Sequence, residues 1–414
     1  MPGDGDLGIG FVGTGFVTKT FHAESLRGIR HAHAAGVMNR TRSKAVDLAG
    51  RLRELECGDP TVHDTVESLV RDPDVDAIWL TSPNHVRVET VERIVSLVDA
   101  GEAELAGIAI EKPLARNLAE GRRVVDLVES VGISHAYLEN QVYMPAIVGM
   151  KDRLWKAGGQ QHRPYLARAA EEHAGPHSAW FWDGERQGGG VLNDMMCHSH
   201  KVNNFLLEST VGDSLTPVAV SCDLSTLKWT RDEYADELLD EYGVDYRAAP
   251  SEDYARATVY YRTPGGQIVV GEATNSWCYV GSGLRMTVEL LGPEYSGSIN
   301  TLDAGLEVFL SSDVPGETGY MLEKQQSEEG AIPVIPDEVT TYGYLAQNRH
   351  VIDAFRCGEH AREDLHDGLA VLRLCMASYK AAETGERMSL ESVDLTDYVP
   401  APARGDFEPA VPAQ

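Results

Sequence analysis

Hydrophobic positions follow two different rhythms along the 414 residues of this chain. Up to about residue 140, short apolar runs alternate with segments in which apolar residues recur every three or four positions. The runs predict β-strands and the wider spacing predicts amphipathic helices, an alternation that favours a parallel sheet covered by helices. The predicted strands are 7–13, 32–39, 76–83, 107–113 and 134–140, and the predicted helices are 16–27, 42–55, 89–101 and 117–132.

After residue 140 the spacing becomes a strict alternation of apolar and polar residues, which is typical of strands with one buried face. Residues 255–263 and 267–277 show it most clearly, and the Pro-Gly-Gly between them predicts a hairpin. This half should therefore be dominated by a mostly antiparallel sheet. Further strand patterns lie at 285–300 and 306–312, an acidic helix or insertion is predicted at 230–243, and a final helical pair at about 342–357 and 364–384.

The net charge and the cysteine content indicate which partners and which cellular compartment to expect. The chain has 64 acidic against 36 basic residues, and its net charge of −28 disfavours nucleic acid and anionic membrane surfaces as partners. Its six cysteines contain no CxxC pair and are interpreted as buried residues in a reducing compartment. Neither an export signal nor an apolar run of membrane-spanning length is evident, so we expect a cytoplasmic protein.

The first predicted strand ends in GTGFVT, residues 13–18, which opens the first predicted helix. Gly13 permits a tight turn, and Gly15 allows a pyrophosphate to approach the backbone at the helix N-terminus. Thr18 replaces the third glycine of the usual fingerprint, but the strand–turn–helix context favours dinucleotide binding, with Phe16 and Val17 in the same turn. The alternative is a glycine-bearing turn without a ligand.

The end of the second predicted strand bears on the choice between NAD and NADP. Asn39 stands where an acidic residue usually binds the adenosine ribose, and Arg40 and Arg42 follow it. Without the acid a 2′-phosphate is not repelled, and the arginines could bind it, which favours NADP or dual use. Asn39 can also bind a ribose hydroxyl, and both arginines could simply be solvated, so NAD stays open.

Two short segments, TSPNH at 81–85 and EKP at 111–113, lie at the carboxyl ends of predicted parallel strands. Ligands of doubly wound sheets bind at this carboxyl edge. Pro113 stiffens the backbone after Lys112, and a cis bond between them would be a deliberate feature. By itself Lys112 could equally be a surface lysine. The cofactor-binding residues predicted here are Ser82, Pro83, Asn84, His85, Glu111 and Lys112.

The segment GGGVLNDMMCHSH, residues 188–200, carries candidate acid–base chemistry. Asp194 and His198 are four residues apart and share one face of a helix. A neutral His198 can accept a hydroxyl proton and return it, while Asp194 could orient the imidazole or bind a neighbouring hydroxyl. We expect the glycines to let the backbone pass close to nicotinamide and substrate. One helix cannot aim Cys197 and His200 at the same ion as Asp194 and His198, so no metal is predicted.

A candidate substrate wall lies upstream of the glycines. It consists of His173, His177, Trp180 and Trp182. Aromatic rings offer flat faces to a sugar and histidines supply hydrogen bonds. The alternative is that one or both tryptophans fill the core.

Together the motifs GTGFVT, TSPNH, EKPLA and GGGVLNDMMCH resemble, in order and spacing, those of the Gfo/Idh/MocA oxidoreductases, relatives of glucose–fructose oxidoreductase and inositol dehydrogenase. Residues 344–388 are also similar to the C-terminal helices of that family. The resemblance implies an α/β chain with a Rossmann dinucleotide-binding domain, which we place over 1–140, followed by an α+β domain with a large, mostly antiparallel open sheet over 141–397. The composition of residues 398–414 predicts a flexible tail that is disordered or loosely docked. It implies Lys112, Asp194 and His198 as catalytic residues. Val142 stands where an arginine is common in the family, which leaves Tyr143 as a substrate candidate beside Asp194 and His198.

The resulting expectation is an NAD- or NADP-dependent oxidoreductase acting on a secondary hydroxyl or ketone of a sugar, glycoside or polyol. One alternative is a redox-neutral glycosidase or lyase that uses a bound NAD to form a transient 3-keto sugar. Another is a non-catalytic dinucleotide-binding regulator. An open sheet face in the second domain predicts a homodimer or homotetramer.

Overall fold

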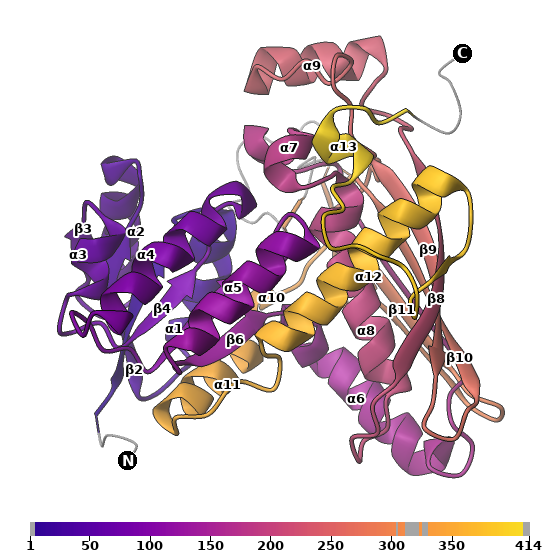
Figure 1. The fold of residues 1–414 in the computed structure, drawn as a ribbon, viewed down its shortest axis with the longest axis horizontal. Helices are drawn as coiled ribbons and strands as arrows, with labels where there is room; N and C mark the ends of the chain where they lie inside the picture. Colours follow the sequence, from indigo (N-terminus) through magenta and orange to yellow (C-terminus); the bar gives the residue numbers. More distant parts are fainter. Residues whose placement is uncertain (1–4, 304, 311–322, 325–329, 409–414) are drawn as a thin grey trace. The chain divides into compact units, whose positions relative to one another are not determined.

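The computed structural model describes residues 5–303, 305–310, 323–324 and 330–408, and it divides into two compact units (Figure 1). The first unit contains Met1–Met144 and Tyr342–Leu372, and the second contains Pro145–Thr341 and Arg373–Gln414. The sequence-based division at residue 140 lies close to the first boundary. It did not foresee that the chain returns to the first unit at Tyr342.

A six-stranded parallel sheet with the order β3-β2-β1-β4-β5-β6 forms the first unit, which confirms the predicted Rossmann fold. Five strands match predicted apolar runs. The sixth, β3, was not predicted, because a strand of three partly exposed residues gives no periodic signal. The strands are β1 (Leu7–Val12), β2 (Ala32–Met38), β3 (Thr61–His63), β4 (Ala77–Leu80), β5 (Gly107–Glu111) and β6 (Ser134–Leu138).

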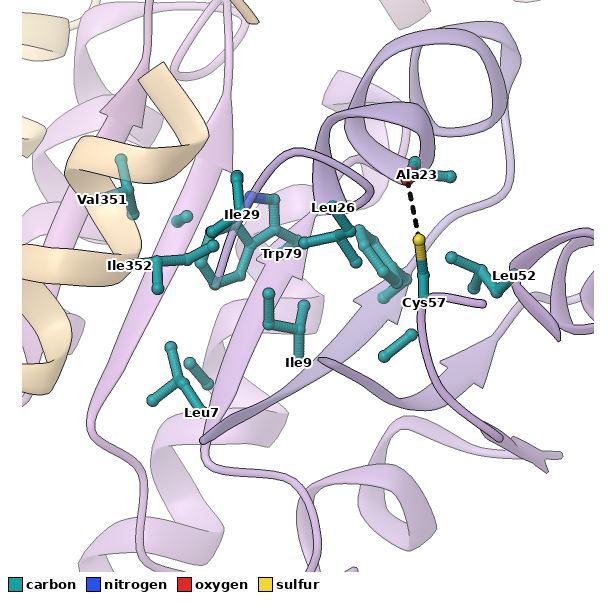
Figure 2. Close-up of a cluster of buried hydrophobic side chains, with 14 of the residues drawn as sticks. Leu7, Ile9, Ala23, Leu26, Ile29, Leu52, Cys57, Trp79, Val351 and Ile352 are labelled. Atoms are coloured by element: carbon teal, nitrogen blue, oxygen red, sulfur yellow. Dashed lines mark hydrogen bonds between the residues drawn. The ribbon is translucent and has the colours of Figure 1, made fainter. Parts of the chain in front are cut away.

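Alternate residues of these strands face two separate apolar cores. Trp79 points into one core, where Val351 and Ile352 of α11 pack beside it (Figure 2). Ile78 points into the other, under α3, α4 and α5. The apolar face of α11 explains why the chain returns to this unit. The helices are η1 (Thr18–His22), α1 (Ala23–Leu26), α2 (Arg42–Glu54), α3 (Val66–Val70), η2 (Asn84–Val86), α4 (Arg87–Asp99), α5 (Leu118–Ser130), η3 (Asn140–Tyr143) and α11 (Tyr344–Arg356).

The second unit is built on a seven-stranded sheet with the order β12-β11-β7-β10-β9-β8-β15. Only β7 and β10 pair in parallel, so the predicted mostly antiparallel sheet is confirmed. The predicted hairpin is also present, with Arg262 opposite Ile268. The strands are β7 (Leu166–Glu172), β8 (Thr216–Ser225), β9 (Tyr254–Arg262), β10 (Ile268–Ser276), β11 (Arg285–Leu291), β12 (Ser296–Asn300) and β15 (Met388–Ser389).

Helix α8 packs against β7 and β10, and this contact places the candidate catalytic helix on the sheet (Figure 1). Asn203 of α8 donates to the Glu272 carbonyl over 2.8 Å, and the absence of a side chain at Gly271 allows the close approach. The remaining elements are α6 (Pro145–Leu154), η4 (Trp155–Gly159), η5 (Ala179–Phe181), α7 (Gly184–Gln187), η6 (Leu192–Met196), α8 (Cys197–Leu207), α9 (Asp232–Tyr242), β13 (Glu307–Leu310), β14 (Gly330–Pro333), α10 (Glu338–Thr341), α12 (Leu365–Thr384) and α13 (Ala401–Arg404).

The acidic segment forms helix α9, one of the two alternatives predicted, and residues 398–408 of the predicted tail contact the second unit. The Glu383 carboxylate accepts the Tyr398 hydroxyl at 2.6 Å and the Ala401 N–H at 2.7 Å, which docks α13. Residues 409–414 and the end of the predicted strand 306–312 lie outside the described residues. Among the described helices, none has the length and apolar character needed to cross a bilayer.

Candidate active site

The turn after β1 has the backbone geometry that dinucleotide binding requires. Gly13 has φ 109°, and a Cβ there would lie 2.8 Å from Thr81 Oγ1 and 2.9 Å from the Ser82 nitrogen, so only glycine fits. A Cβ on Gly15 would meet no atom within 4 Å, so the backbone there faces open space. Thr18, in the place of the third glycine, shares a 2.8 Å hydrogen bond with Thr81 and joins the loops after β1 and β4.

Two buried hydroxyls at this edge of the sheet are suited to bind a polar ligand. Thr14 Oγ1 and Ser82 Oγ form no hydrogen bond with any residue that the structure describes. A buried hydroxyl without a partner costs free energy, so both groups are suited to bind phosphate or ribose oxygens. Val17 is half-buried, whereas Phe16 is 43% exposed and rests edge-on against Phe21. The chain's own residues therefore fit a dinucleotide.

The three polar residues after β2, Asn39, Arg40 and Arg42, differ in their contacts. Asn39 Nδ2 donates to the Thr41 carbonyl over 3.0 Å, and Arg42 forms an ion pair with Asp64. Arg40 is exposed and makes no ion pair with any part of the chain that the structure describes. Of the two arginines, only Arg40 therefore keeps its charge available for an anion.

Lys112 is half-buried directly after β5, and its bond to Pro113 is cis. The Glu111 carboxylate is buried and turned into the unit, where Oε2 accepts the Lys112 N–H at 3.1 Å and Oε1 bonds His22 Nε2 at 2.8 Å. Glu111 thus orients the segment, and its predicted contact with the cofactor stays a prediction. In the TSPNH loop Asn84 is buried, and Pro83 and His85 are half-buried.

In the second unit, Asp194 and His198 lie on one continuous helical segment, Asp194 in the π-helical turn η6 and His198 in α8. Their exposed fractions are 5% and 3%. π-Helical turns are rare and recur at functional sites. Both predicted acid–base residues are therefore held inside the unit by helical backbone rather than by a loop.

The start of this segment is capped by two buried side chains from elsewhere in the unit. Glu252 Oε1 accepts the N–H groups of Gly190 at 3.0 Å and Leu192 at 2.9 Å, and the Glu252 carbonyl accepts that of Val191 at 3.0 Å. The Tyr379 hydroxyl accepts the Asn193 N–H at 3.2 Å. These bonds satisfy backbone donors that a helix N-terminus leaves open.

The three glycines before the helix make room for this cap, and their approach to nicotinamide and substrate stays a prediction. A Cβ on Gly189, whose φ is 142°, would overlap the Tyr379 hydroxyl, and one on Gly190 would overlap the Glu252 carbonyl oxygen. Gly188 has φ 87° and ends α7. The glycine run is therefore explained by packing inside the second unit.

Asp194 is linked to groups that the sequence did not single out. Trp277 Nε1 donates to Asp194 Oδ2 over 3.3 Å. Burial and the nearby Lys324 ammonium lower the pKa of His177 to about 4, and the Asp194 carboxylate partly opposes this shift. His177 is therefore neutral at neutral pH and lies close to Asp194. Lys324 Nζ donates to the Gly175 carbonyl over 3.1 Å.

The predicted aromatic wall divides into a buried and an accessible part. Trp182 is 1% exposed and packs edge-on against Trp229, Tyr246 and Trp277, so it is a core residue and its predicted substrate contact is corrected. Trp180 is half-buried and stacks on Phe181 with ring centroids 3.8 Å apart.

His173 and Tyr143 are also largely enclosed. His173 is 3% exposed, and its Nδ1 accepts the Gly175 N–H at 2.9 Å. In the first unit, Tyr143 is 7% exposed, and the Arg362 guanidinium lies 4.2 Å from its ring centroid. Arg362 thus brings a cation to the segment in which Val142 replaces the expected arginine. His177 and Trp180 remain the more accessible candidates for substrate contact.

Comparison with known proteins agrees with this architecture. Residues 7–136 match the family model described as "Oxidoreductase family, NAD-binding Rossmann fold", and residues 158–294 match the GFO/IDH/MocA C-terminal domain. The chain belongs to the GFO/IDH/MocA oxidoreductase family. Its N-terminal domain is accordingly an NAD-binding Rossmann domain.

Individual relatives are distant. The chain is 27% identical over 222 residues to D-xylose dehydrogenase of Paenarthrobacter nicotinovorans, covering 51% of this chain and 50% of that protein. It therefore spans about half the length of the curated relatives it matches. The crystal structure of GenD2 from gentamicin A biosynthesis with NAD has TM-score 0.74 at 22% identity, covering 94% and 97% of the two chains. Levoglucosan dehydrogenase with NADH and levoglucosan has TM-score 0.67 at 20% identity, covering 93% and 99%.

The residues that first suggested a metal in this GFO/IDH/MocA protein are buried. Cys197 Sγ donates to the Asp194 carbonyl over 3.3 Å, and His200 Nε2 bonds Ser378 Oγ at 3.3 Å. Burial lowers the pKa of His200 to about 4. Both side chains are thus committed to packing and local hydrogen bonds.

A second group of metal-ligand type lies in the first unit, where ligand atoms of Glu129, His135 and His366 are all within 4.8 Å of one another. His135 Nδ1 accepts the Leu365 N–H at 3.2 Å. In neutral His135 the proton is therefore on Nε2, which leaves that atom no lone pair for a metal. This tautomer disfavours metal binding by His135.

Proposed function

We propose that this GFO/IDH/MocA protein is an NAD(P)-dependent oxidoreductase that acts on a secondary hydroxyl or ketone of a sugar, glycoside or polyol. The observation that carries the proposal is the buried pair Asp194 and His198 on one capped helix, in a chain whose other unit is an NAD-binding Rossmann domain. A buried carboxylate and imidazole four residues apart are suited to orient a hydroxyl and to move its proton.

The roles of the chain's own residues follow from their chemistry. A bound nicotinamide supplies or accepts the hydride. His198, as a neutral imidazole, accepts the hydroxyl proton during oxidation and returns it during reduction. Asp194, held by Trp277, orients the imidazole or a substrate hydroxyl. In the first unit, the Lys112 ammonium stabilises negative charge that develops on the reacting oxygen.

We also propose that the protein accepts NADP as a cofactor. Asn39 does not repel a 2′-phosphate, and Arg40 is exposed with its charge available. Charge-assisted hydrogen bonds from a guanidinium are strong binders of phosphate. Arg40 is therefore the residue proposed to favour NADP over NAD.

The substrate class is supported by the accessible His177 and Trp180 of the second unit, which offer a hydrogen-bonding group and an aromatic face. Relatives named for D-xylose and levoglucosan are dehydrogenases, which favours net oxidoreduction over redox-neutral glycoside cleavage. We further propose a cytoplasmic homodimer or homotetramer, formed through the open face of the second sheet.

The test is a turnover assay with matched variants. The purified protein is offered NAD or NADP with a panel of pentoses, anhydrosugars and inositols, and reduced nicotinamide is followed by absorbance. His198→Ala should lower kcat by about a thousandfold while nucleotide affinity stays within about threefold. His162→Ala removes an exposed imidazole from the same unit and should behave like wild type. Absence of turnover on the whole panel, or a His198→Ala variant as active as wild type, would overturn the proposal.

A further inference from the structure

Two buried side chains hold the residues on either side of Lys112. His22 in η1 bonds the Glu111 carboxylate, and Arg87 at the start of α4 bonds the Pro113 carbonyl. The exposed fractions of His22 and Arg87 are 1% and 2%. Lys112 therefore lies between two polar contacts that come from other elements of the same unit.

The hydrogen-bond directions around His22 can be assigned from its neighbours. Trp79 Nε1 can only donate, and its acceptor is Asn348 Oδ1 at 2.9 Å, while Asn348 Nδ2 donates to the Tyr344 carbonyl over 3.0 Å. The Asn348 amide is thereby fixed in orientation. His22 Nδ1, which lies 3.1 Å from the same Oδ1, must carry a proton and donate it.

A single proton then lies between His22 and Glu111. If it is on His22 Nε2 the pair is an imidazolium and a carboxylate, and if it is on Glu111 both groups are neutral. The 2.8 Å bond to Oε1 exists in either case, and Oε2 accepts the Lys112 N–H at 3.1 Å. Glu111 thus transmits the position of His22 directly to the backbone of Lys112.

Arg87 fixes the other side with both ends of its guanidinium. Nη1 donates to the Pro113 carbonyl, and Nη2 donates to the Ser82 carbonyl over 3.0 Å. Burial lowers the pKa of Arg87 to about 10, opposed by the nearby Glu111 carboxylate, so it stays charged at neutral pH. The rigid fork of an arginine can join two carbonyls in this way, whereas a lysine ammonium is a single point of charge.

We propose that His22 and Arg87 are positioning residues for Lys112, which fix the backbone before and after it so that its ammonium has one defined place at the carboxyl edge of the sheet. The inference rests on the role given to Lys112 in the proposed function. We propose no contact of either residue with substrate or cofactor.

A double-mutant cycle tests this inference. His22→Leu and Arg87→Lys should each lower kcat by about tenfold or more, because small displacements of a reacting group have effects of this size, while nucleotide Kd stays within about threefold. His22→Gln keeps a donor toward Glu111 and should recover most of the activity. In a Lys112→Met background, His22→Leu and Arg87→Lys should cause no further fall in kcat, because both act through the absent ammonium.

The inference would be overturned if the effects of His22→Leu and Arg87→Lys on kcat added fully to the effect of Lys112→Met. Unchanged kcat in both single variants would also overturn it. If His22→Leu does not fold, the Arg87→Lys cycle gives the same answer. If the wild type turns over no sugar, the proposed function fails separately, and amine labelling read by mass spectrometry still tests the contacts. The labelling rate of Lys112 should then change by about threefold or more in His22→Leu relative to exposed Lys156, and an unchanged rate would contradict the inference.

Discussion

The hydroxyl of Tyr379 donates a 2.6 Å hydrogen bond to Oε1 of Glu252, and both groups are fully enclosed in the second unit. Glu252 precedes β9 and Tyr379 lies in α12, so two distant parts of the chain meet at the start of the helix that carries Asp194 and His198. Burial raises the pKa of Glu252 to about 7, although hydrogen bonds from the Tyr379 hydroxyl and from the backbone N–H groups of Leu192, Glu252 and Gly190 oppose this shift. We therefore expect the stability of this cap to respond to substitution and to pH.

Tyr379→Phe should destabilise the second unit. The change leaves the Asn193 N–H without its acceptor and removes one of the three donors to Glu252 Oε1. We expect a loss of about 1–3 kcal/mol in the free energy of unfolding, measured by urea titration. Tyr260→Phe, whose hydroxyl bonds only exposed Arg387 among the described residues, should change it by less than about 0.5 kcal/mol. Equal effects of the two substitutions would contradict the importance of the cap.

Glu252→Gln should alter how stability depends on pH. The pKa of Glu252 is about 7 in the folded protein against 4.5 ordinarily, so between these values the folded state binds a proton that the unfolded chain releases. This contribution is present below pH 4.5 and is lost as the pH rises through 7. A glutamine cannot titrate, so the free energy of unfolding of the variant relative to wild type should rise by about 3 kcal/mol over this interval.

Urea unfolding at successive pH values measures this difference. The pKa of buried His200 is lowered to about 4, so it destabilises the wild type in the opposite direction, as the pH falls below 6.5. Subtracting the wild-type curve from the variant curve removes that contribution. Parallel curves for wild type and Glu252→Gln would show that Glu252 does not titrate in this range.

The variants Trp182→Ala and Trp180→Ala should distinguish a core residue from a residue that contacts the substrate. Trp182 lies within a cluster of three other aromatic rings, and its removal should cost about 3–5 kcal/mol of unfolding free energy. Trp180 is half-buried, so its removal should cost less and should chiefly raise the KM for the sugar. Thermal unfolding and steady-state kinetics of both variants decide the assignment, and the reverse pattern would contradict it.

Arg40→Ser should change the choice of cofactor. The variant removes the guanidinium proposed to bind a 2′-phosphate, so the Kd for NADPH should rise about tenfold or more while the Kd for NADH changes little. Fluorescence titration with each nucleotide measures both constants. Arg42→Ser is the matched control, because Arg42 already pairs with Asp64. An equal loss for NADH and NADPH in Arg40→Ser would rule out a phosphate-specific role.

The architecture of both units could be predicted from the sequence, because apolar runs such as 107–113 and the alternation over 255–263 are local signals. Contacts between distant residues could not. Nothing local indicates that Val351 of α11 packs beside Trp79, or that Gly189 and Gly190 make room for Tyr379 and Glu252. The motif Asp194–His198 was visible, but Trp277, which donates to Asp194, lies too far along the chain to be grouped with it.

The central claim is that the chain catalyses net hydride transfer with His198 as the proton acceptor. The most direct measurement uses a sugar or polyol with deuterium on the carbon of its secondary hydroxyl and follows deuterium in the nicotinamide by mass spectrometry. We expect deuterated NADH or NADPH in proportion to the ketone formed, at a rate about a thousandfold lower in His198→Ala. Product formation without deuterium in the nicotinamide, or equal rates in wild type and His198→Ala, would contradict it.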